Sequence, residues 1–404
     1  MTINSPKNVK LIIKVLEDNG YEAYAVGGCV RDALLGKKPN DWDITTSAMP
    51  QDVKRLFRKT IDTGIAHGTV TVLIEGVGYE VTTYRIDGEY TDGRHPENVE
   101  FTGNLIEDLK RRDFTINAMA YNDRKGIVDE FDGVGDLKRK EIKCVGNPTD
   151  RFNEDALRIL RAVRFAAVLD FDIDNNTKEA IQKLSVNLSK ISKERIQAEL
   201  EKLIMSNHPE KLFIAYETGI TKVVFDEIDR LAQNNMLENV ISMLCKMPED
   251  HYIRWSGLLC MTDKEASKEI LKNLKFDNKT IDIVSRIVDA SKRNIPCTRA
   301  DVRKDIYEVG EDIYKLYIQF LKVFKEEEKQ EIDAVETEYK SIIEKNECIS
   351  LKALAVNGRD LIETGASRGT EVGEGLKMLL YKVLENQDLN ERQTLINIFN
   401  KSET

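Results

Sequence analysis

Residues 26–43 read VGGCVRDALLGKKPNDWD, a stretch with two adjacent glycines, an arginine and two closely spaced aspartates. Gly27 and Gly28 end the strand pattern YEAYAVGG and precede a short helical pattern, which predicts a strand–turn–helix joint. Asp41 and Asp43 stand two apart on a predicted strand, where alternate side chains point the same way. Neighbouring carboxylates repel each other unless a cation lies between them. The stretch is therefore typical of a metal site beside a tight turn, although a solvated turn after a plain joint explains the same residues.

The same residue types suit a nucleoside triphosphate. Backbone N–H groups at Gly27 and Gly28 can approach phosphate oxygens, because no Cβ stands in the way and a helix begins there. Arg31, one turn further on, can add a guanidinium fork. Mg²⁺ prefers oxygen ligands and is often held by one or two carboxylates together with substrate phosphates. The stretch is not a Walker loop, because no Gly-Lys-Ser/Thr follows the glycines.

Length and composition set outer limits. The chain has 404 residues, which predicts two or more domains. No run approaches the roughly 20 apolar residues needed to cross a bilayer, and the polar start is not typical of a signal peptide. The six cysteines have no CxxC or Cys/His spacing, which argues against a zinc site or a disulfide framework. We therefore expect a cytoplasmic protein with no membrane contact. Since its formal net charge is −10, nucleic-acid contacts would require local basic surfaces.

The first 150 residues predict an α+β head, because β-branched runs alternate there with turn glycines and short helical patterns. Gly76, Val77 and Gly78 separate two strand patterns and predict a hairpin turn. The predicted strands cover residues 21–28, 41–46, 69–75, 79–86 and 126–131, and the predicted helices cover residues 30–36 and 49–57.

From Arg151 onward, apolar residues recur three and four positions apart, which predicts an almost wholly helical remainder. One clear pattern is EDALRILRAVRFAAVL at residues 154–169. We divide the chain into a head at 1–150, a helical neck at 151–210, a helical body at 211–300 and a helical tail at 301–404.

Further motifs follow the opening stretch in a fixed order. They are DLKRRDFTINAMA at 108–120, DEFDGVGDL at 129–137, EDALRILRAVRF at 154–165 and SKERIQAE at 192–199. Together they resemble the nucleotidyltransferase head of the DNA polymerase β superfamily, in the branch of bacterial tRNA nucleotidyltransferases and poly(A) polymerases. LAVNGRDLIE at 354–363 and the stretch at 383–399 are similar to the tail of class II CCA-adding enzymes of the Bacillus type. The resemblance implies a polymerase β-like head with a mixed sheet, followed by an extended helical part.

The resemblance assigns Asp41 and Asp43 to Mg²⁺ ions that activate an RNA 3′-hydroxyl and neutralise departing pyrophosphate. Glu80 is the candidate for a third carboxylate. The resemblance also implies that Asp113 contacts the ribose, and we assign Arg112 to the nucleotide. A helix N-cap is an alternative role for Asp113.

Asp155, Arg158, Arg161 and Arg164 recur every three residues in the pattern at 154–169. By resemblance, Asp155 and Arg158 present hydrogen-bonding groups to the incoming base, while Arg161 and Arg164 hold the triphosphate or orient the base-reading pair. A salt-bridge ladder on an exposed helix face explains the same spacing. Arg195 and Glu199 are four apart and predict an intrahelical pair in a supporting role.

The resemblance implies an enzyme that adds C, C and A to the 3′ end of tRNA from CTP and ATP, with the helical tail on the acceptor arm. The polar segment 87–99 would be the loop needed to change from C to A addition, although a surface hairpin explains its composition. The alternatives are an A-adding enzyme or poly(A) polymerase of the same family, and a non-catalytic RNA-binding protein. No obligatory protein partner is evident.

Overall fold

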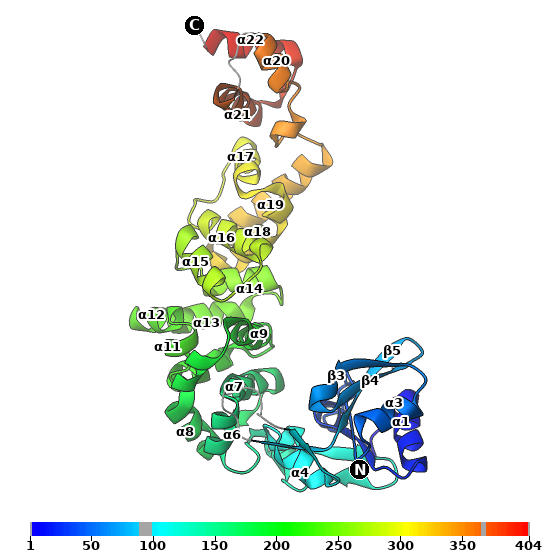
Figure 1. Ribbon diagram of the computed structural model, residues 1–404. Coiled ribbons are helices and arrows are strands. Elements are labelled where there is room, and N and C mark those ends of the chain that lie inside the picture. Colours follow the sequence, from blue (N-terminus) through cyan, green and yellow to red (C-terminus); the bar gives the residue numbers. More distant parts are fainter. Residues whose placement is uncertain (1, 89–98, 365–368, 403–404) are drawn as a thin grey trace. The chain divides into compact units, whose positions relative to one another are not determined.

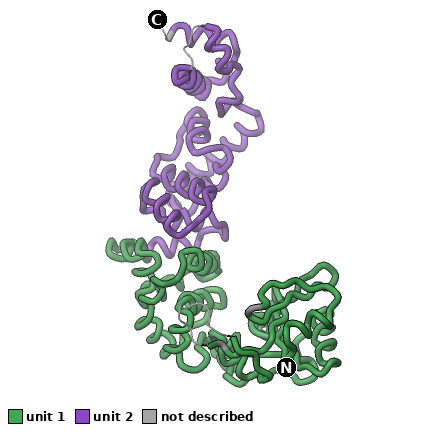
Figure 2. Tube along the Cα trace, viewed as in Figure 1, with its two compact units in different colours: residues 1–238 green, residues 239–404 purple. Residues whose placement is uncertain are grey.

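The computed structural model describes residues 2–88, 99–364 and 369–402. Two compact units divide the chain, Met1–Glu238 and Asn239–Thr404, here called unit 1 and unit 2 (Figure 2). Their boundary falls inside the predicted body at 211–300, and the finer four-part division stays a prediction. In the described residues no helix has both the length and the apolar character needed to span a bilayer.

A mixed seven-stranded sheet in unit 1 confirms the predicted head (Figure 1). Its strand order is β3-β4-β5-β2-β1-β8-β9, in which β2 and β5 run parallel and the other neighbours run antiparallel. The strands are β1 (Ala23–Val26), β2 (Ile44–Thr46), β3 (Thr60–Gly64), β4 (Thr69–Ile74), β5 (Val77–Thr83), β8 (Ala120–Asn122) and β9 (Gly126–Val128). A buried cluster that includes residues of β1 and β8 comprises Tyr24, Val26, Tyr84, Leu105, Leu109 and Ala120.

Helices and two short strands complete the head. The elements are α1 (Lys7–Asp18), α2 (Gly28–Leu34), α3 (Pro50–Leu56), η1 (Ile65–His67), β6 (Arg85–Asp87), β7 (Val99–Phe101), α4 (Leu105–Lys110), η2 (Thr115–Asn117) and α5 (Gly133–Arg139). Pro50 stands at the first position of α3, where its missing N–H costs no hydrogen bond.

The hairpin between β4 and β5 forms, but its turn lies earlier than predicted. Ile74 pairs directly with Val77, so the loop consists of Glu75 and Gly76. Both residues have positive φ angles, 53° and 81°, as a two-residue type I′ turn requires. Val77 and Gly78 therefore belong to β5, and the predicted turn at residues 76–78 is wrong by about two residues.

Helices dominate the rest of unit 1. The elements are β10 (Glu141–Ile142), α6 (Pro148–Glu154), α7 (Leu157–Leu169), β11 (Asp172–Ile173), α8 (Asn175–Leu184), η3 (Ser185–Lys190), α9 (Lys193–Ile204), η4 (Pro209–Lys211), α10 (Leu212–Glu217), α11 (Thr221–Val224) and α12 (Glu227–Gln233). The pattern at 154–169 is not one helix, because Asp155 is extended (φ −142°, ψ 104°) and α7 begins at Leu157. Asp155 thus precedes the three arginines of α7.

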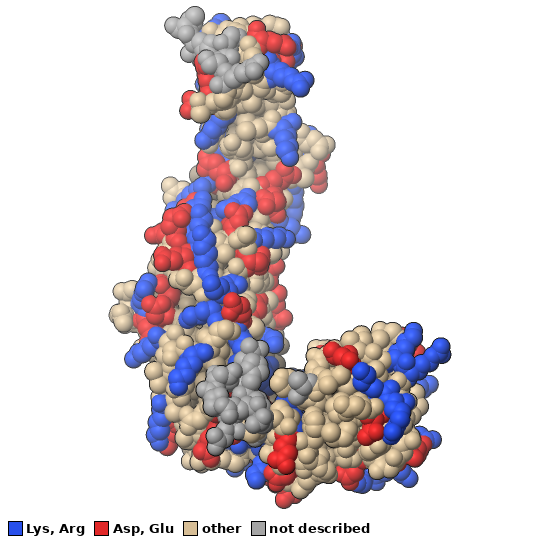
Figure 3. Space-filling view, in the orientation of Figure 1, with Lys and Arg blue, Asp and Glu red and all other residues tan. Residues whose placement is uncertain are grey.

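Unit 2 is helical throughout its described residues, as predicted. Its elements are α13 (Leu237–Lys246), which begins before the unit boundary, α14 (His251–Leu258), α15 (Lys264–Asn273), α16 (Asn278–Ala290), α17 (Arg299–Val309), α18 (Glu311–Phe324), η5 (Glu326–Glu328), α19 (Lys329–Glu344), η6 (Leu351–Ala353), α20 (Gly358–Glu363), α21 (Thr370–Glu385), η7 (Gln387–Leu389) and α22 (Arg392–Ser402). Basic and acidic side chains are interspersed on the face of unit 2 that Figure 3 shows.

All six cysteines lie in the described residues, and none forms a disulfide. Cys245 and Cys297 are exposed, and both belong to unit 2. The buried cysteines are Cys29, Cys144, Cys260 and Cys348.

Candidate active site

Asp41 and Asp43 lie in the extended segment that leads into β2, rather than within the strand as predicted. The segment still pairs with β1, because Val26 N donates to Asp43 O at 3.0 Å. Trp42 is buried, with 9% of its surface exposed, while both aspartates are exposed. This alternation puts the two carboxylates on one side, as the sequence predicts, and the indole on the other.

Asp43 lies in a negative environment. Neighbouring protein atoms that keep water from the Asp43 carboxyl group, together with the charges of Glu80 and Asp41, raise its pKa, and the charge of Arg112 opposes them. A divalent cation would relieve this repulsion, so the pair fits the predicted metal. Within the described ranges no group of three or more His, Cys, Asp or Glu side chains is arranged to hold a metal ion. The two aspartates would therefore depend on substrate phosphates to complete the coordination of a cation, and the role of Glu80 stays open.

Glycine occupies positions 27 and 28 for different structural reasons. Gly27 has a φ of 79°, and a Cβ there would lie 3.0 Å from Nη1 of Arg112. Any other residue would strain the backbone and press on that guanidinium group. Gly28 begins α2, and its Cβ would make only an ordinary contact, 3.6 Å from Nη2 of Arg31. The turn therefore requires Gly27, while Gly28 keeps the backbone open.

Arg31 is buried, and several neighbouring side chains hold its guanidinium group. Its Nη1 donates to Asn117 Oδ1 at 2.7 Å, and its Nε donates to Asp32 Oδ1 at 2.8 Å. Its guanidinium carbon also lies 5.1 Å from the centre of the Phe165 ring. Arg31 is thus fixed in place beside the glycine turn, and its contact with phosphate stays a prediction.

Asp108 on α4 organises the arginine pair of the DLKRRDF motif, a role that the sequence analysis missed. Its side chain is fully buried and accepts hydrogen bonds from Arg111 Nη2 at 2.8 Å and Arg112 Nη2 at 3.3 Å. Thr45 of β2 donates to it at 3.1 Å. Burial alone would raise the pKa of Asp108, but the charges of Arg112 and Arg111 outweigh it and lower the pKa. The spacing of three and four residues is the sequence signal for this cluster.

Asp113 is buried, and both of its oxygens are occupied. Oδ1 accepts hydrogen bonds from Phe114 N at 2.8 Å and Asn117 Nδ2 at 3.1 Å, and Oδ2 accepts from Arg161 Nη2 at 2.6 Å. Burial would raise the pKa of Asp113, but the charge of Arg161 and these hydrogen bonds lower it well below its usual range. The N-cap of η2 is Phe114, so the alternative role of Asp113 as that cap is wrong.

A cavity of about 270 Å³ brings most of the predicted nucleotide residues together. It is lined by Arg111, Arg112, Asp113, Asp155, Leu157, Arg158, Arg161 and Arg195. Arg112 joins this cavity to the rest of the site, because it lies against Gly27 and its charge acts on Asp43. The other predicted site residues lie outside the cavity wall, namely Gly27, Gly28, Arg31, Asp41, Asp43 and Arg164.

Asp155 and Arg158, the predicted base-reading pair, are each held by a neighbour. Asp155 accepts from Leu157 N at 3.0 Å and from Arg195 Nη2 at 2.8 Å. Arg158 donates to Glu154 Oε2 at 2.6 Å. A carboxylate can accept about four hydrogen bonds and a guanidinium group can donate five, so both side chains keep capacity for a base edge.

Helix α9 supports α7, but not through the predicted intrahelical pair. Arg195 reaches Asp155, while Glu199 lies 2.7 Å from Nε of Arg164 and 4.0 Å from Nη1 of Arg161. Glu199 is buried, with 6% of its surface exposed. The exposed salt-bridge ladder predicted as an alternative for residues 154–169 is wrong, because Arg161 and Arg164 pair with the buried carboxylates Asp113 and Glu199 of other elements. Arg158 alone pairs with a near neighbour, Glu154, whose side chain is half-buried.

The predicted switching loop lies mostly outside the described residues. Its flanks are ordered as the antiparallel pair of β6 and β7, in which Asp87 pairs with Val99. Residues 89–98 between them belong to the part that the structure does not describe, so the role of this loop stays a prediction.

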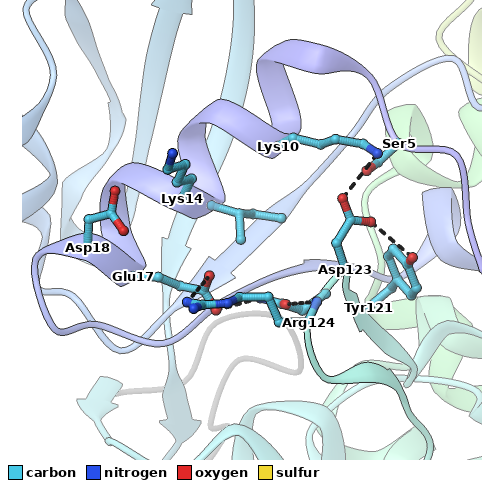
Figure 4. A pocket seen from close by; sticks show the side chains of 10 residues that line it. Ser5, Lys10, Lys14, Glu17, Asp18, Tyr121, Asp123 and Arg124 are labelled. Carbon is cyan, nitrogen blue, oxygen red and sulfur yellow. Dashed lines mark hydrogen bonds and ion pairs between the residues drawn. The ribbon is translucent and has the colours of Figure 1, made fainter.

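A second cavity of the head, about 340 Å³ in volume, lies against α1 and the turn after β8 (Figure 4). Charged side chains that line it form ion pairs, between Lys10 and Asp123 at 3.1 Å and between Arg124 and Glu17 at 3.5 Å. The residues that line it include no predicted site residue. This cavity is therefore separate from the candidate active site.

Family models match three successive segments of the chain. The Poly A polymerase head domain matches residues 23–143, the probable RNA and SrmB-binding site of polymerase A matches residues 170–231, and tRNA nucleotidyltransferase domain 2 matches residues 247–399. The first match contains Asp41, Asp43 and the arginine pair after α4. The motifs at 108–120 and 129–137 also lie in the first match, and the motif at 192–199 lies in the second. The motif at 154–165 falls between these two matches.

Curated relatives match nearly the whole chain. The CCA-adding enzyme of Levilactobacillus brevis is 38% identical over 388 residues, which cover 95% of each chain. The CCA-adding enzyme of Ligilactobacillus salivarius is 37% identical over 400 residues, 97% of this chain and 96% of the relative.

Solved structures have the same fold. The Bacillus stearothermophilus CCA-adding enzyme in complex with CTP superposes with a TM-score of 0.79 at 31% identity, covering 98% of this chain and 96% of that one. The Thermotoga maritima CCA-adding enzyme complexed with tRNA covers all of both chains, with a TM-score of 0.66 and 22% identity. The second match shows likeness of fold alone.

Proposed function

The chain belongs to the family of CCA-adding enzymes, and from this premise we propose that it adds C, C and A in turn to the 3′ end of tRNA. CTP and ATP would be the donors, and each addition would release pyrophosphate. The observation that carries the proposal is the junction at Arg112, which links the 270 Å³ cavity of predicted nucleotide residues to Gly27 and Asp43.

Asp41 and Asp43 would hold Mg²⁺, which would lower the pKa of the attacking hydroxyl and neutralise the charge that develops on the phosphates. The chain itself supplies the orientation of these carboxylates, because buried Trp42 anchors the segment between them. Arg112 adds a positive charge on the cavity side of Asp43. Asp113, fixed by Asn117 and Arg161, would orient the ribose.

Base selection would depend on Asp155 and Arg158. Cytosine and adenine both present an exocyclic amine and a ring nitrogen. The amine can donate a hydrogen bond to a carboxylate, and the ring nitrogen can accept a hydrogen bond from a guanidinium group. Uracil and guanine present a carbonyl where the amine should be, and this oxygen would face the Asp155 carboxylate. An unpaired buried polar group costs about 1–3 kcal/mol, which is enough to discriminate between bases. A pair of side chains would thus replace a nucleic-acid template.

Unit 2 would bind the acceptor arm, chiefly through the RNA backbone and its shape. Because the whole chain is acidic, this contact must use locally basic surfaces rather than net charge.

The experiment that tests the proposal incubates the protein and Mg²⁺ with three tRNAs, ending before CCA, after CC and after CCA. Each tRNA receives CTP, ATP, both, or UTP and GTP, and the products are resolved at single-nucleotide length. Completion to CCA without further growth is the expected result. Addition only after CC would replace the proposal with an A-adding enzyme, and long A tails would replace it with a poly(A) polymerase.

A further inference from the structure

Phe165 of α7 lies among three arginine side chains. The guanidinium carbon of Arg164 is 3.8 Å from the centre of its ring, that of Arg31 is 5.1 Å away and that of Arg161 is 5.4 Å away. The ring is buried, with 5% of its surface exposed. Arg31 comes from α2 beside the glycine turn, so this ring joins the head to the helix that carries the other arginines.

These three cations repel one another. Burial lowers the pKa of Arg164, and the neighbouring charges of Arg161 and Arg31 lower it further, against the opposing charges of Glu199 and Asp113. Arg31 pairs with Asp32, whereas Arg161 pairs with Asp113 and Arg164 with Glu199. Among the described residues, no carboxylate pairs with both Arg31 and an arginine of α7. The face of Phe165 is the contact that the arginines of both helices share.

An aromatic ring is suited to this place. Its electron-rich face attracts cations, and the attraction strengthens where water is excluded. Phe114, which follows Asp113, meets Phe165 edge-on with the ring centres 5.7 Å apart and the planes at 79°. This arrangement is favourable for aromatic pairs and fixes the orientation of the Phe165 ring. An aliphatic side chain of similar size would fill the space without attracting the guanidinium groups.

We propose that Phe165 is a positioning residue for nucleotide binding, whose ring gathers Arg31, Arg161 and Arg164 before the nucleotide arrives. The triphosphate then meets assembled cations and does not have to draw them together, which reduces the free energy lost on binding. The inference rests on the proposed use of these arginines by a nucleoside triphosphate. It assigns to Phe165 an effect on nucleotide affinity rather than on the chemical step.

The test compares Phe165→Leu with Phe165→Tyr, which keeps the ring, and with Phe171→Leu. Phe171 is also buried, follows the same helix, and has no cation over its ring in the described structure. Phe165→Leu should raise the Kd for CTP and for ATP about tenfold, the effect of losing roughly one desolvated cation–π contact. The KM values should rise in parallel, while kcat at saturation stays within about twofold. Phe165→Tyr should restore the affinity, and Phe171→Leu should lower thermal stability alone.

Three results would overturn the inference. They are unchanged affinity in Phe165→Leu, equal weakening in Phe171→Leu, and failure of Phe165→Tyr to restore binding. Phe165→Met provides a second non-aromatic variant if leucine does not give folded protein. The Kd for the nucleotide is measured without tRNA, so the test of Phe165 does not depend on whether the chain extends tRNA. A wild-type chain that binds CTP but extends no tRNA would refute the proposed function, and the comparison of Kd values would still decide the role of Phe165.

Discussion

Each arginine that lines the 270 Å³ cavity is already paired with a carboxylate of the chain. Arg111 and Arg112 share Asp108, while Arg161 binds Asp113 and Arg195 binds Asp155. These pairs hold the guanidinium groups in place, because an unpaired arginine would move among many rotamers. Such preorganisation reduces the entropy lost when a nucleotide binds.

Arg195 gives the first prediction at this scale. Arg195→Ala should release the Asp155 carboxylate and lower kcat/KM for CTP and ATP about 10- to 100-fold, as expected for a charge-assisted hydrogen bond of about 1.5–3 kcal/mol. Because Asp155 would then be able to turn, incorporation of UTP or GTP should rise relative to CTP. Single-nucleotide extension assays measure both effects. Arg230→Ala is the control, because Arg230 pairs with Asp226 on the exposed surface of α12. Equal effects of the two variants would contradict the positioning role.

Asp41 and Asp43 give the second prediction. Asp41→Ala and Asp43→Ala should each reduce nucleotide addition below detection, since a hard cation would lose one of its two carboxylates. Binding of tRNA, measured by gel shift, should stay within about twofold of wild type, because backbone contacts elsewhere dominate RNA affinity. Asp18→Asn, which alters an exposed carboxylate of α1, serves as the control. Unchanged addition in either alanine variant would rule out the metal role of that residue.

At the scale of elements, Asp108 connects α4, β2 and the arginine pair that follows α4 through a single buried carboxylate. Both arginines of the motif depend on it, and Arg112 is also the residue that touches the glycine turn. The packing of α4 is therefore coupled to the geometry of the active site.

Asp108→Asn gives the third prediction. It should lower the free energy of unfolding at pH 7 by about 1.5–3 kcal/mol, the contribution of charge-assisted hydrogen bonds, because the half-buried Arg111 and Arg112 would lose the charge of the buried carboxylate. The folded state lowers the pKa of Asp108, so its contribution is complete above the ordinary aspartate pKa of about 3.9 and is lost as the pH falls through the folded value. The gap between wild type and variant should therefore narrow below about pH 4. Urea unfolding at pH 7 and pH 3 measures the difference in the free energy of unfolding between wild type and variant. A difference that is larger at pH 3 than at pH 7 would contradict this prediction.

The sequence predicts local features of these elements better than their partners. The glycine turn, the hairpin of β4 and β5 and the alternation around Trp42 follow from spacing within a few residues. The sequence does not predict the break at Asp155, because the apolar pattern runs through it, whereas the extended backbone of Asp155 separates α6 from α7. Pattern alone does not show where one helix ends if the next begins at once.

Partners far apart in the chain were the least predictable. Their spacing predicts that Arg195 pairs with Glu199 on its own helix, but Arg195 reaches Asp155, 40 positions away. Arg31 meets Phe165 across an even longer separation. Such pairs depend on how helices pack, which a single sequence does not encode locally. The residue types of the site could therefore be predicted, whereas the network that holds them could not.

At the scale of the whole molecule, the residues assigned to chemistry and to base selection all lie in unit 1. The match to tRNA nucleotidyltransferase domain 2 covers residues 247–399, which lie within unit 2. The candidate nucleotide site and the part proposed to bind the acceptor arm thus belong to different compact units of the chain.

A truncated chain gives the fourth prediction. A fragment ending at Met236, just before α13 begins, should bind CTP with a Kd within about threefold of the full chain, since its cavity residues are all retained. It should extend tRNA at least about tenfold less efficiently at low RNA concentration, because one set of RNA contacts is lost. Isothermal titration and extension assays test the two parts. A fragment that extended tRNA as well as the full chain would contradict the role of unit 2.

The placement of the cysteines makes the chain ready for site-selective labelling. Burial raises the pKa of Cys29 to about 11 and those of Cys144 and Cys260 to about 12, so these thiols stay protonated and inaccessible at neutral pH. Cys245 and Cys297 are exposed, and both belong to unit 2. A maleimide dye should therefore attach to unit 2 of the natural chain and leave the nucleotide cavity unmodified. Fluorescence from such a dye would report the arrival and departure of tRNA during successive additions, without any engineered cysteine.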